Sequence, residues 1–427
     1  MFNKYYTLLN KTILIEIKDY NIHIVGAGIS GLVAAIVLEQ NGYSPILIEA
    51  TDKVGGRVKT DIVDGYRLDH GFQVLLTASP AAKKYLDFEA LDLQHFLPGA
   101  CIFKEGKQKI IGDPFRNVSL LFSTIFSGIG TFSDKIKILK LNKLLKKKSI
   151  DEIFAAKEKS TSTYLMDLGF SFAIINDFFK PFFSGIFLES KLETSSRMFE
   201  FIYKMFGEGH TAIPKLGMAA IPEQLLKKLK HSQFKYNTKV TQIKDGEIVL
   251  SNGEKLESHF TIVATDASSL IPNLKNQAIQ WKSCQNLYFE TDNKVIKKPL
   301  IALIPDNKAL INNIYYSVNL DIISDSAKSL LSVTVVDSNN FSTEKIIEKV
   351  KKELKNYCGI NSIRFIKHYD IPMSLPVLNN LQYEMLPSET RLSTGVFLAG
   401  DTQLNGSLNA AIISGEKAAL GVIQTLG

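Results

Sequence analysis

A glycine-rich turn between an apolar run and an alanine-rich segment constrains the fold of this chain more than any other feature. The glycines have G-x-G-x-x-G spacing and are Gly26, Gly28 and Gly31. Residues 22–25 before them are typical of a buried strand, and residues 32–40 after them are typical of a helix. A second apolar run at residues 46–48 closes on Glu49, so the unit takes about thirty residues, as a βαβ unit does. The sequence therefore predicts an α/β domain of the Rossmann type.

Each glycine of this turn has a mechanical role in dinucleotide binding. Gly26 permits the tight turn, Gly28 lets the backbone approach a pyrophosphate, and Gly31 allows the helix to pack closely on the strand. The N-terminus of the helix then faces the phosphates with unpaired N–H groups and a partial positive charge. Glu49 lies about 20 residues further on, where a carboxylate accepts hydrogen bonds from the adenosine ribose and disfavours a 2′-phosphate. The alternative is a glycine-rich turn in an unrelated βα unit.

A second glycine pair follows the acid, in the stretch VGGR. An NAD domain does not need it, whereas a flavin enzyme must also hold the longer second half of its dinucleotide. Gly55 and Gly56 would let the backbone pass close to the pyrophosphate and the ribityl chain, and Arg57 could place its planar guanidinium on a phosphate.

Four segments resemble the flavin-containing amine oxidase superfamily, which includes monoamine oxidases, protoporphyrinogen oxidases and phytoene desaturases. Glu49 to Arg57 resembles the family signature E-x-x-x-x-x-G-G-R, and DGYRLDHGFQVL resembles the D-x-G segment beside the isoalloxazine, which carries over to Asp69 and Gly71. The family's β-hairpin unit, which contains an adenine-contacting valine, is similar to the stretch YNTKVTQIKDGEIVLSNGEKLESHFTIVAT. The family's closing strand, Gly-Asp pair and last helix are similar to the stretch GVFLAGDTQLNGSLNAAIISGEKAAL.

The resemblance implies a Rossmann-like FAD-binding domain of the glutathione-reductase type and non-covalent FAD, because the closing motif has no cysteine or histidine. The residues implied to bind FAD are Gly26, Gly28, Ile29, Ser30, Gly31, Glu49, Ala50, Gly55, Gly56, Arg57, Gly71, Phe72, Val240, Gly400, Asp401, Gly406, Ser407 and Leu408. The last helix would direct its N-terminus at the flavin edge where negative charge collects on reduction. No catalytic acid or base is assigned. His70, beside Asp69, is interpreted as holding a backbone carbonyl or, alternatively, as a general base.

The chain of 427 residues is long enough for two domains. The predicted FAD-binding domain comprises residues 21–78, 209–280 and 390–427. The predicted substrate-binding domain, of α+β type, comprises residues 79–208, which read as helical and aromatic-rich, and 281–389, which read as an antiparallel sheet with one charged helix near 342–357. Residues 1–20 are an N-terminal extension, either an edge strand or a disordered lead.

The composition of the chain limits which further sites, partners and compartments are expected. The three cysteines, Cys101, Cys284 and Cys358, lie far apart, and the histidines show no ligand spacing, so no metal site or redox dithiol is expected. Free thiols suit a reducing compartment and predict a cytoplasmic protein. The net charge of +7 concentrates in residues 133–149, where seven lysines accompany one acid after an apolar stretch. Residues 118–149 form either an ordinary helix with snorkelling lysines or a peripheral contact with the inner face of a membrane. Nucleic acid is not expected, because no aromatic interleaving accompanies the charge.

These features predict an FAD-dependent oxidoreductase that transfers a hydride from a small-molecule substrate to flavin N5. True amine oxidases resemble one another in presenting an aromatic side chain at the position that Leu408 occupies in this chain. The aliphatic side chain of Leu408 therefore favours an apolar substrate that is dehydrogenated at carbon. The phenylalanine-rich stretch at residues 170–187 either lines a tunnel for that substrate or packs a helical core. The alternatives are an amine oxidase, or a non-catalytic protein similar to the Rab escort and GDP-dissociation-inhibitor proteins.

Overall fold

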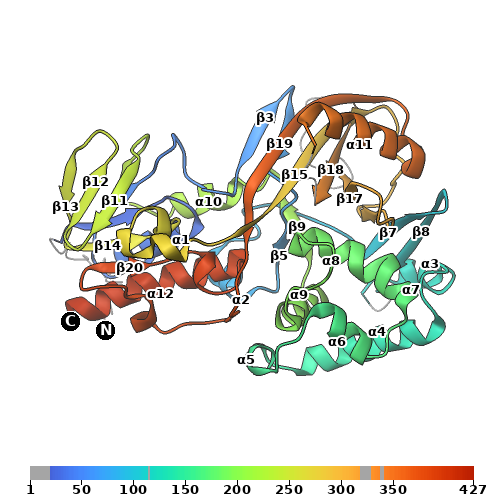
Figure 1. The fold of residues 1–427 in the computed structure, drawn as a ribbon, viewed down its shortest axis with the longest axis horizontal. Coiled ribbons are helices and arrows are strands. Elements are labelled where there is room, and N and C mark those ends of the chain that lie inside the picture. The colour runs from blue at the N-terminus through green and yellow to red at the C-terminus, as the bar shows by residue number, and fades with distance from the viewer. Residues whose placement is uncertain (1–19, 114–115, 318–327, 337–340) are drawn as a thin grey trace, which may run out of the picture.

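The structure, a computed structural model, describes residues 20–113, 116–317, 328–336 and 341–427 (Figure 1). Apart from Tyr20, the predicted N-terminal extension lies outside the described residues. Figure 1 shows two parts side by side. The first contains the start of the described chain and its C-terminal helix, and the second contains a large sheet above a helical lobe.

A five-stranded parallel sheet forms the centre of the first part. Its strands, in spatial order, are β10 (Gln233–Lys235), β2 (Ile46–Ile48), β1 (Ile22–Val25), β14 (Phe260–Val263) and β20 (Val396–Leu398). All four neighbouring pairs are parallel, and β1 in the middle is buried along its whole length. Continuous apolar strands are what a parallel sheet needs when both of its faces are covered. Each sequence segment assigned to the FAD-binding domain supplies at least one of these strands, although the limits of the two domains stay a prediction.

The parallel sheet is covered by helices and by a small antiparallel sheet. The helices are α1 (Ile29–Gln40), α12 (Leu408–Leu426), α10 (Ala220–Leu226) and α2 (Pro80–Tyr85). The small sheet is formed by β11 (Val240–Lys244), β12 (Glu247–Leu250) and β13 (Lys255–Glu257). Helices α1 and α12 pack so closely that a Cβ added at Gly415 would lie 2.2 Å from the carbonyl oxygen of Ser30.

A seven-stranded sheet dominates the second part. Its order is β19 (Ile363–Pro376), β15 (Trp281–Thr291), β18 (Ser329–Val336), β17 (Ile311–Tyr316), β16 (Ile301–Leu303), β7 (Gly99–Lys104) and β8 (Lys107–Gly112). All neighbours are antiparallel except β16 and β7, which pair in parallel. The predicted charged helix is α11 (Thr343–Cys358), and its buried face packs into the core of this sheet.

Residues 79–208 differ from the purely helical prediction. Strands β7 and β8 come from this segment and extend the large sheet, and β6 (Leu93–His95) pairs with β9 (Thr211–Pro214), which also pairs with β5 (Leu75–Leu76). The prediction of a continuous helical segment was therefore wrong for residues 93–112. These strands are short, and the partners of β6 and of the outer side of β7 lie more than a hundred residues away in the chain, so local pattern does not reveal those pairings, whereas β7 and β8 form a local hairpin.

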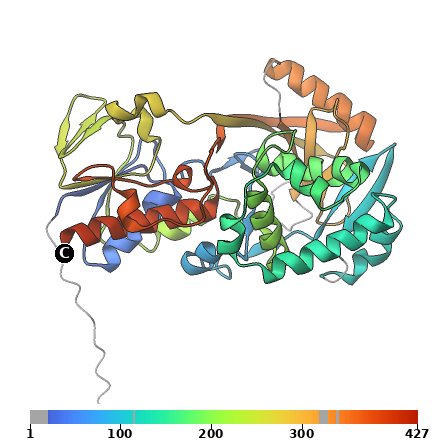
Figure 2. The ribbon, with the colours of Figure 1, turned by 60° about the horizontal axis from the view of Figure 1, so that its bottom comes forward.

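The rest of this segment is a helical lobe, seen below the sheet in Figure 2. It contains α3 (Leu121–Ile125), α4 (Phe132–Lys147), α5 (Ile150–Ala155), α6 (Thr161–Asp167), α7 (Phe172–Ile174), α8 (Lys180–Phe187) and α9 (Ser196–Glu208). Phe179, Phe183 and Phe187 are fully buried, and the ring of Phe183 lies 4.6 Å from that of Phe199. Of the two interpretations of the phenylalanine-rich stretch, these contacts favour the helical core.

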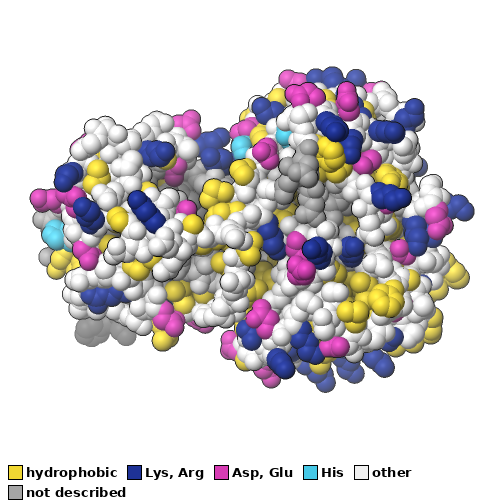
Figure 3. Space-filling view, in the orientation of Figure 1, with side chains coloured by type: hydrophobic (Ala, Val, Ile, Leu, Met, Phe, Trp, Pro, Cys, Tyr) yellow, Lys and Arg dark blue, Asp and Glu magenta, His cyan; other side chains and the backbone are white. Residues whose placement is uncertain are grey.

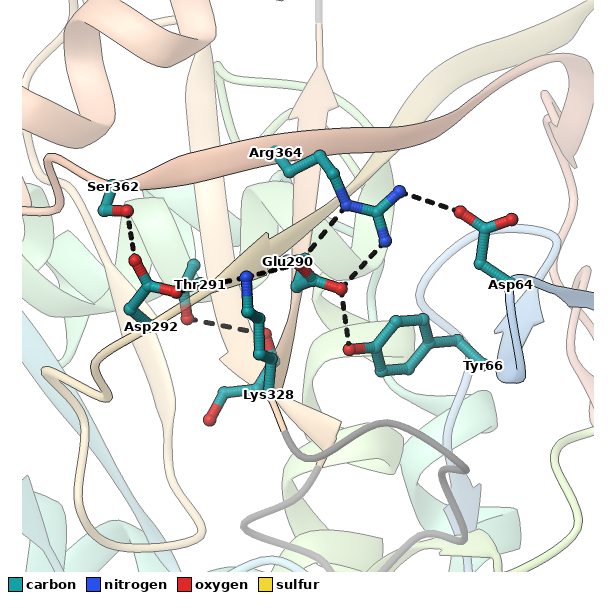
Figure 4. A network of polar contacts seen from close by, with 9 residues as sticks. Asp64, Tyr66, Glu290, Thr291, Asp292, Lys328, Ser362 and Arg364 are labelled. Carbon is teal, nitrogen blue, oxygen red and sulfur yellow. Dashed lines mark hydrogen bonds and ion pairs between the residues drawn. The ribbon is translucent and has the colours of Figure 1, made fainter.

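A polar network fastens a β-hairpin to the large sheet (Figure 4). The hairpin consists of β3 (Thr60–Val63) and β4 (Tyr66–Asp69). Its Tyr66 hydroxyl donates to Glu290 of β15 at 3.2 Å, and Arg364 of β19 contacts Glu290 at 2.8 Å and Asp64 at 2.9 Å. The guanidinium of Arg364 holds the pKa of Glu290 at about 2. The network thus fixes the chain that leads into the D-x-G segment.

Candidate functional site

Close backbone packing requires glycine at the first turn of the site. Gly26 has φ 100°, and its N–H donates to the carbonyl of Ile48 at 2.9 Å. A Cβ at Gly31 would lie 2.0 Å from the carbonyl oxygen of Gly26, so only glycine allows α1 to start so close to β1. Among the described residues, no side chain caps the N-terminus of α1, because its N-cap position is Gly28. The first N–H groups of the helix are therefore left for a ligand.

The second glycine turn lies directly against the first. The N–H of Gly55 donates to the carbonyl of Ala27 at 2.9 Å, and Gly55 and Gly28 form an isolated parallel bridge. A Cβ at Gly56 would lie only 3.3 Å from the Cα of Gly28, and Gly56 has φ 59°. The two turns together form a surface on which Gly28, Gly55 and Gly56 leave the backbone without side chains; we name it the glycine cradle and define it as residues 26–31 and 55–56. A pyrophosphate requires such a surface, and a Cβ would fill it.

Glu49 is buried at the edge of the glycine cradle. Its Oε2 accepts a hydrogen bond from the N–H of Ala27 at 2.9 Å, and its Oε1 accepts from the N–H and hydroxyl of Thr51 at 2.9 and 2.8 Å. A carboxylate offers about four acceptor positions, so one on Oε2 remains for a further donor such as a ribose hydroxyl. The carbonyl of Glu49 also accepts from the N–H of Thr238 at 2.9 Å, which brings the start of β11 and Val240 beside the acid.

Arg57 contacts the C-terminal segment. Its guanidinium pairs with the carboxylate of Asp401, donates to the carbonyl of Ser374 at 3.2 Å and lies 5.0 Å from the centre of the Trp281 ring. The sequence placed Arg57 and Asp401 in the same site but did not pair them. It also missed Trp281 and Ser374, although Trp281 is the only tryptophan of the chain and that rarity was an available signal.

The predicted C-terminal residues form a compact turn before α12. The N–H of Gly400 donates to Ser414 Oγ at 2.9 Å, and the N–H of Gly406, at φ 72°, donates to the carbonyl of Asp401 at 2.9 Å. Ser407 is the N-cap of α12, and its Oγ accepts from the N–H of Ala410 at 3.0 Å. Leu408 is the first residue of α12.

The D-x-G segment packs against the large sheet. Asp69 is buried, and its carboxylate accepts from Thr60 Oγ1 at 2.5 Å and from the N–H of Met218 at 2.9 Å. Burial raises the pKa of Asp69 to about 6, although these two hydrogen bonds act in the opposite direction. The hydroxyl of Tyr288 on β15 donates to the carbonyl of Asp69 at 2.9 Å. A Cβ at Gly71 would lie 2.9 Å from the Cδ1 of Ile371 on β19.

His70 has a different partner from the backbone carbonyl that the sequence suggested. Its Nε2 lies 2.7 Å from Asp61 Oδ2, which also accepts from the hydroxyl of Tyr369 at 3.0 Å. The His70 and Tyr369 rings lie 4.4 Å apart. Burial opposes the change, but the hydrogen bonds from His70 and Tyr369 lower the pKa of Asp61 below its ordinary value. The prediction of a carbonyl partner was therefore wrong, and Asp61 and Tyr369 were missed.

Aromatic side chains continue the site beyond Gly71. The ring of Phe72 lies 4.8 Å from that of Tyr315 and 6.1 Å from that of Phe96. Tyr315 and Phe96 are buried, and Phe72 is partly buried against the same core. These three residues come from three distant parts of the sequence, and only Phe72 belonged to a motif.

A parallel dinucleotide-type sheet with a double glycine cradle, joined to a separate and mostly antiparallel sheet, defines a flavoprotein-like α/β fold. A family model described as flavin containing amine oxidoreductase matches residues 29–423. The chain belongs to this family. Membership confirms the predicted family, the predicted fold class and FAD as the cofactor.

Individual relatives match more locally. Protoporphyrinogen oxidase 2, chloroplastic/mitochondrial, of Arabidopsis thaliana is 28% identical over 171 residues, which are 40% of this chain and 33% of that protein. Hydroxysqualene dehydroxylase of Rhodopseudomonas palustris is 41% identical over 66 residues, 15% of this chain and 16% of that protein. The chain thus spans a third or less of the length of these relatives. The solved structure of an oxidoreductase from Methanosarcina mazei has a TM-score of 0.70 at 16% identity, covers 95% of this chain and 100% of that one, and supports the fold.

Proposed function

We propose that this protein is an FAD-dependent oxidoreductase that dehydrogenates an apolar small molecule at carbon. The observation that carries the proposal is the contact between the two glycine turns beside the buried carboxylate of Glu49. When bound, FAD accepts a hydride from the substrate at N5 of its isoalloxazine ring.

The chain's own residues bind and orient the cofactor. The glycine cradle and the uncapped N-terminus of α1 receive the pyrophosphate, and the remaining acceptor position of Glu49 receives the ribose. The N-terminus of α12 would direct its partial positive charge at the flavin edge on which negative charge collects. Gly71 has no Cβ, which lets its backbone lie against Ile371 of β19.

The lining of the site favours an apolar substrate. Leu408, at the start of α12, is aliphatic and partly buried, and Phe72, Phe96 and Tyr315 form an aromatic cluster beyond Gly71. An aliphatic side chain offers no quadrupole to orient an amine, whereas it suits a hydrocarbon. Two relatives carry names that refer to a porphyrinogen and to hydroxysqualene, which supports the same class of substrate. The alternative is an amine substrate, as the family description suggests.

The first experiment separates an enzyme from a non-catalytic escort-like protein. We expect the purified protein to be yellow and to release FAD on heating or acidification, because the turn from Gly400 to Ser407 contains no cysteine or histidine that could attach the flavin. A colourless protein that cannot be reconstituted with FAD would favour the escort-like alternative. Flavin that stays with the denatured chain would refute non-covalent binding.

The second experiment addresses the substrate. Under anaerobic conditions, a carotene or porphyrinogen should bleach the oxidised flavin band, and primary amines and polyamines should not. Leu408→Tyr should slow bleaching by the apolar compound, while Leu408→Met should leave it nearly unchanged because volume and polarity are kept. Rapid bleaching of the unmodified protein by a common amine would overturn the substrate class without affecting the proposal of an FAD enzyme.

A further inference from the structure

Large apolar side chains are exposed together at one end of the helical lobe. Five of them are 73–78% exposed, namely Val118, Phe122, Phe126, Phe132 and Phe172. Ile125 and Ile136 lie between them in the chain and are 45% and 40% exposed. We name these seven residues the apolar tip. In Figure 3 hydrophobic side chains gather at the right-hand end of the lobe, where α3 and α7 lie, and lysine or arginine side chains follow its lower edge.

Hydrogen bonds bring the segments of the apolar tip together. Lys135 Nζ donates to the carbonyl of Ile125 at 2.7 Å, which fixes the end of α3 beside the first turn of α4. The carboxylate of Asp134 accepts from the N–H of Thr131 at 2.7 Å and from the hydroxyl of Ser171 at 2.6 Å. The residues next to these contacts are Phe126, Phe132 and Phe172. The exposed phenylalanines therefore form one surface, whereas isolated exposed apolar side chains are normal and need no explanation.

The outer face of α4 changes from apolar to basic along its length. Residues three or four positions apart lie on the same face of a helix. From its first residue to its last, the outer face of α4 carries Phe132, Ile136, Leu139, Lys140, Lys143 and Lys147. The opposite face buries Leu141 and Leu145 in the core of the lobe, so this stripe cannot turn inward. Asp134, the one acid of the helix, is fully buried and engaged in its N-terminal cap.

We propose that the apolar tip and the lysines of α4 dock this protein on the surface of an anionic membrane. Phenylalanine side chains suit the boundary between headgroups and acyl chains, and lysines about one to three turns further along the helix suit the phosphate level. A second copy of the chain fits less well, because Asp134, the one acid of α4, is buried and leaves no carboxylate on this helix to pair with the lysines of another copy. None of the helices in the described part of the chain has the length and hydropathy that crossing a bilayer requires. The proposed docking uses surface side chains of the helical lobe, and it does not depend on the proposed substrate.

The test is flotation of the full-length flavoprotein with lipid vesicles. We expect binding to vesicles of phosphatidylcholine with 30% phosphatidylglycerol, a composition that sets a moderately anionic surface of roughly the kind such patches recognise. Phe122→Ser with Phe126→Ser should lower the partition coefficient at least about tenfold. Lys143→Gln with Lys147→Gln should lower it about 25-fold, since each lysine near such a surface contributes roughly a fivefold factor.

Matched controls use equally exposed positions elsewhere. Ile62→Ser with Leu386→Ser removes apolar side chains that are 71% and 63% exposed, and Lys351→Gln with Lys352→Gln removes two exposed lysines of α11. These variants should bind like the parent, and all variants should keep the parent's flavin content and melting temperature. Three results would overturn the proposal: no binding to the anionic vesicles, equal binding to pure phosphatidylcholine, or controls that lose binding as much as the tip variants. Concentration-dependent self-association that the Phe122 and Phe126 changes abolish would instead assign the surface to a second copy of the chain.

Discussion

Glu49 has two tasks in this site, and replacing it separates them. In the structure its carboxylate accepts three hydrogen bonds from Ala27 and Thr51, so it supports the cradle before any cofactor binds. Truncation in Glu49→Ala leaves buried donors unpaired and should lower the apoprotein's free energy of unfolding by about 1–3 kcal/mol. Loss of charge-assisted ribose hydrogen bonds should cost a further 1.5–3 kcal/mol of FAD binding, or about ten- to a hundredfold in Kd. Glu49→Gln keeps one acceptor oxygen, so its stability should fall less while its FAD affinity still falls.

The only tryptophan supplies the assay. Trp281 lies 5.0 Å from the guanidinium of Arg57, which follows the cradle in the chain, so bound flavin should quench its emission. Titrating apoprotein with FAD gives the Kd, and thermal melting of the same apoprotein gives the stability. Glu39 provides a matched control, because this acid at the far end of α1 accepts backbone N–H bonds from Lys230, His231 and Ser232 at 2.9, 2.9 and 2.6 Å. Glu39→Gln should lower stability and leave the Kd unchanged.

Two outcomes would refute this reasoning about Glu49. An FAD Kd for Glu49→Gln that equals the parent's would show that the carboxylate does not bind the ribose. A Kd for Glu39→Gln that rises as much as that of Glu49→Gln would show that general loosening of the domain, and not a local contact, controls affinity.

Three further predictions concern the packing and charge of the two sheets. Asp69 has a folded-state pKa of about 6, above its unfolded value, so its contribution to stability should decline by up to roughly 3 kcal/mol as pH rises from about 4 to 6. Asp69→Asn should therefore raise the melting temperature at pH 7 and not at pH 4, and equal shifts at the two pH values would contradict this. The pKa of Glu290 is lowered to about 2, chiefly by Arg364, so the stability that Glu290 contributes to the fold should be lost as pH falls from about 4.5 to 2. In circular dichroism melts, the Glu290→Gln variant should lose less stability over this pH range than the parent does. Gly415→Ala should separate α1 from α12 and reduce FAD retention, measured by absorbance after gel filtration, whereas Gly207→Ala, whose Cβ meets none of the described residues within 4 Å, should not.

Local chemistry explains why the backbone elements around the candidate cofactor site could be predicted. The glycines of both turns need positive φ or a missing Cβ, and the acid must follow a buried strand, so each requirement leaves its own mark within about thirty residues of sequence. The turn at Gly406 and the cap at Ser407 are equally local. These elements lie in the structure where the sequence placed them.

Pairing between distant segments explains what could not be predicted. Strand β19 reads as an irregular mixture of charged and apolar residues because it carries two register shifts against β15 and is only partly buried. The contacts of Arg57 with Asp401 and of His70 with Asp61 depend on how hairpin and sheet meet, which no single segment encodes. The exposure of Phe172 also went unrecognised, because a phenylalanine beside six others looked like core.

The parallel sheet has a consequence for the order of events on the ribosome. Its last strand, β20, and the helix that follows, α12, come nearly four hundred residues after β1, yet β20 pairs with β14 next to β1 and α12 packs on α1. At about 5–20 residues per second, tens of seconds separate the emergence of the first glycine turn from that of the last helix. During that interval the apolar face of α1 and one edge of the sheet are uncovered. An uncovered apolar helix face and sheet edge favour aggregation of the nascent chain, and the contacts of α12 with α1 form only after the last helix has been translated.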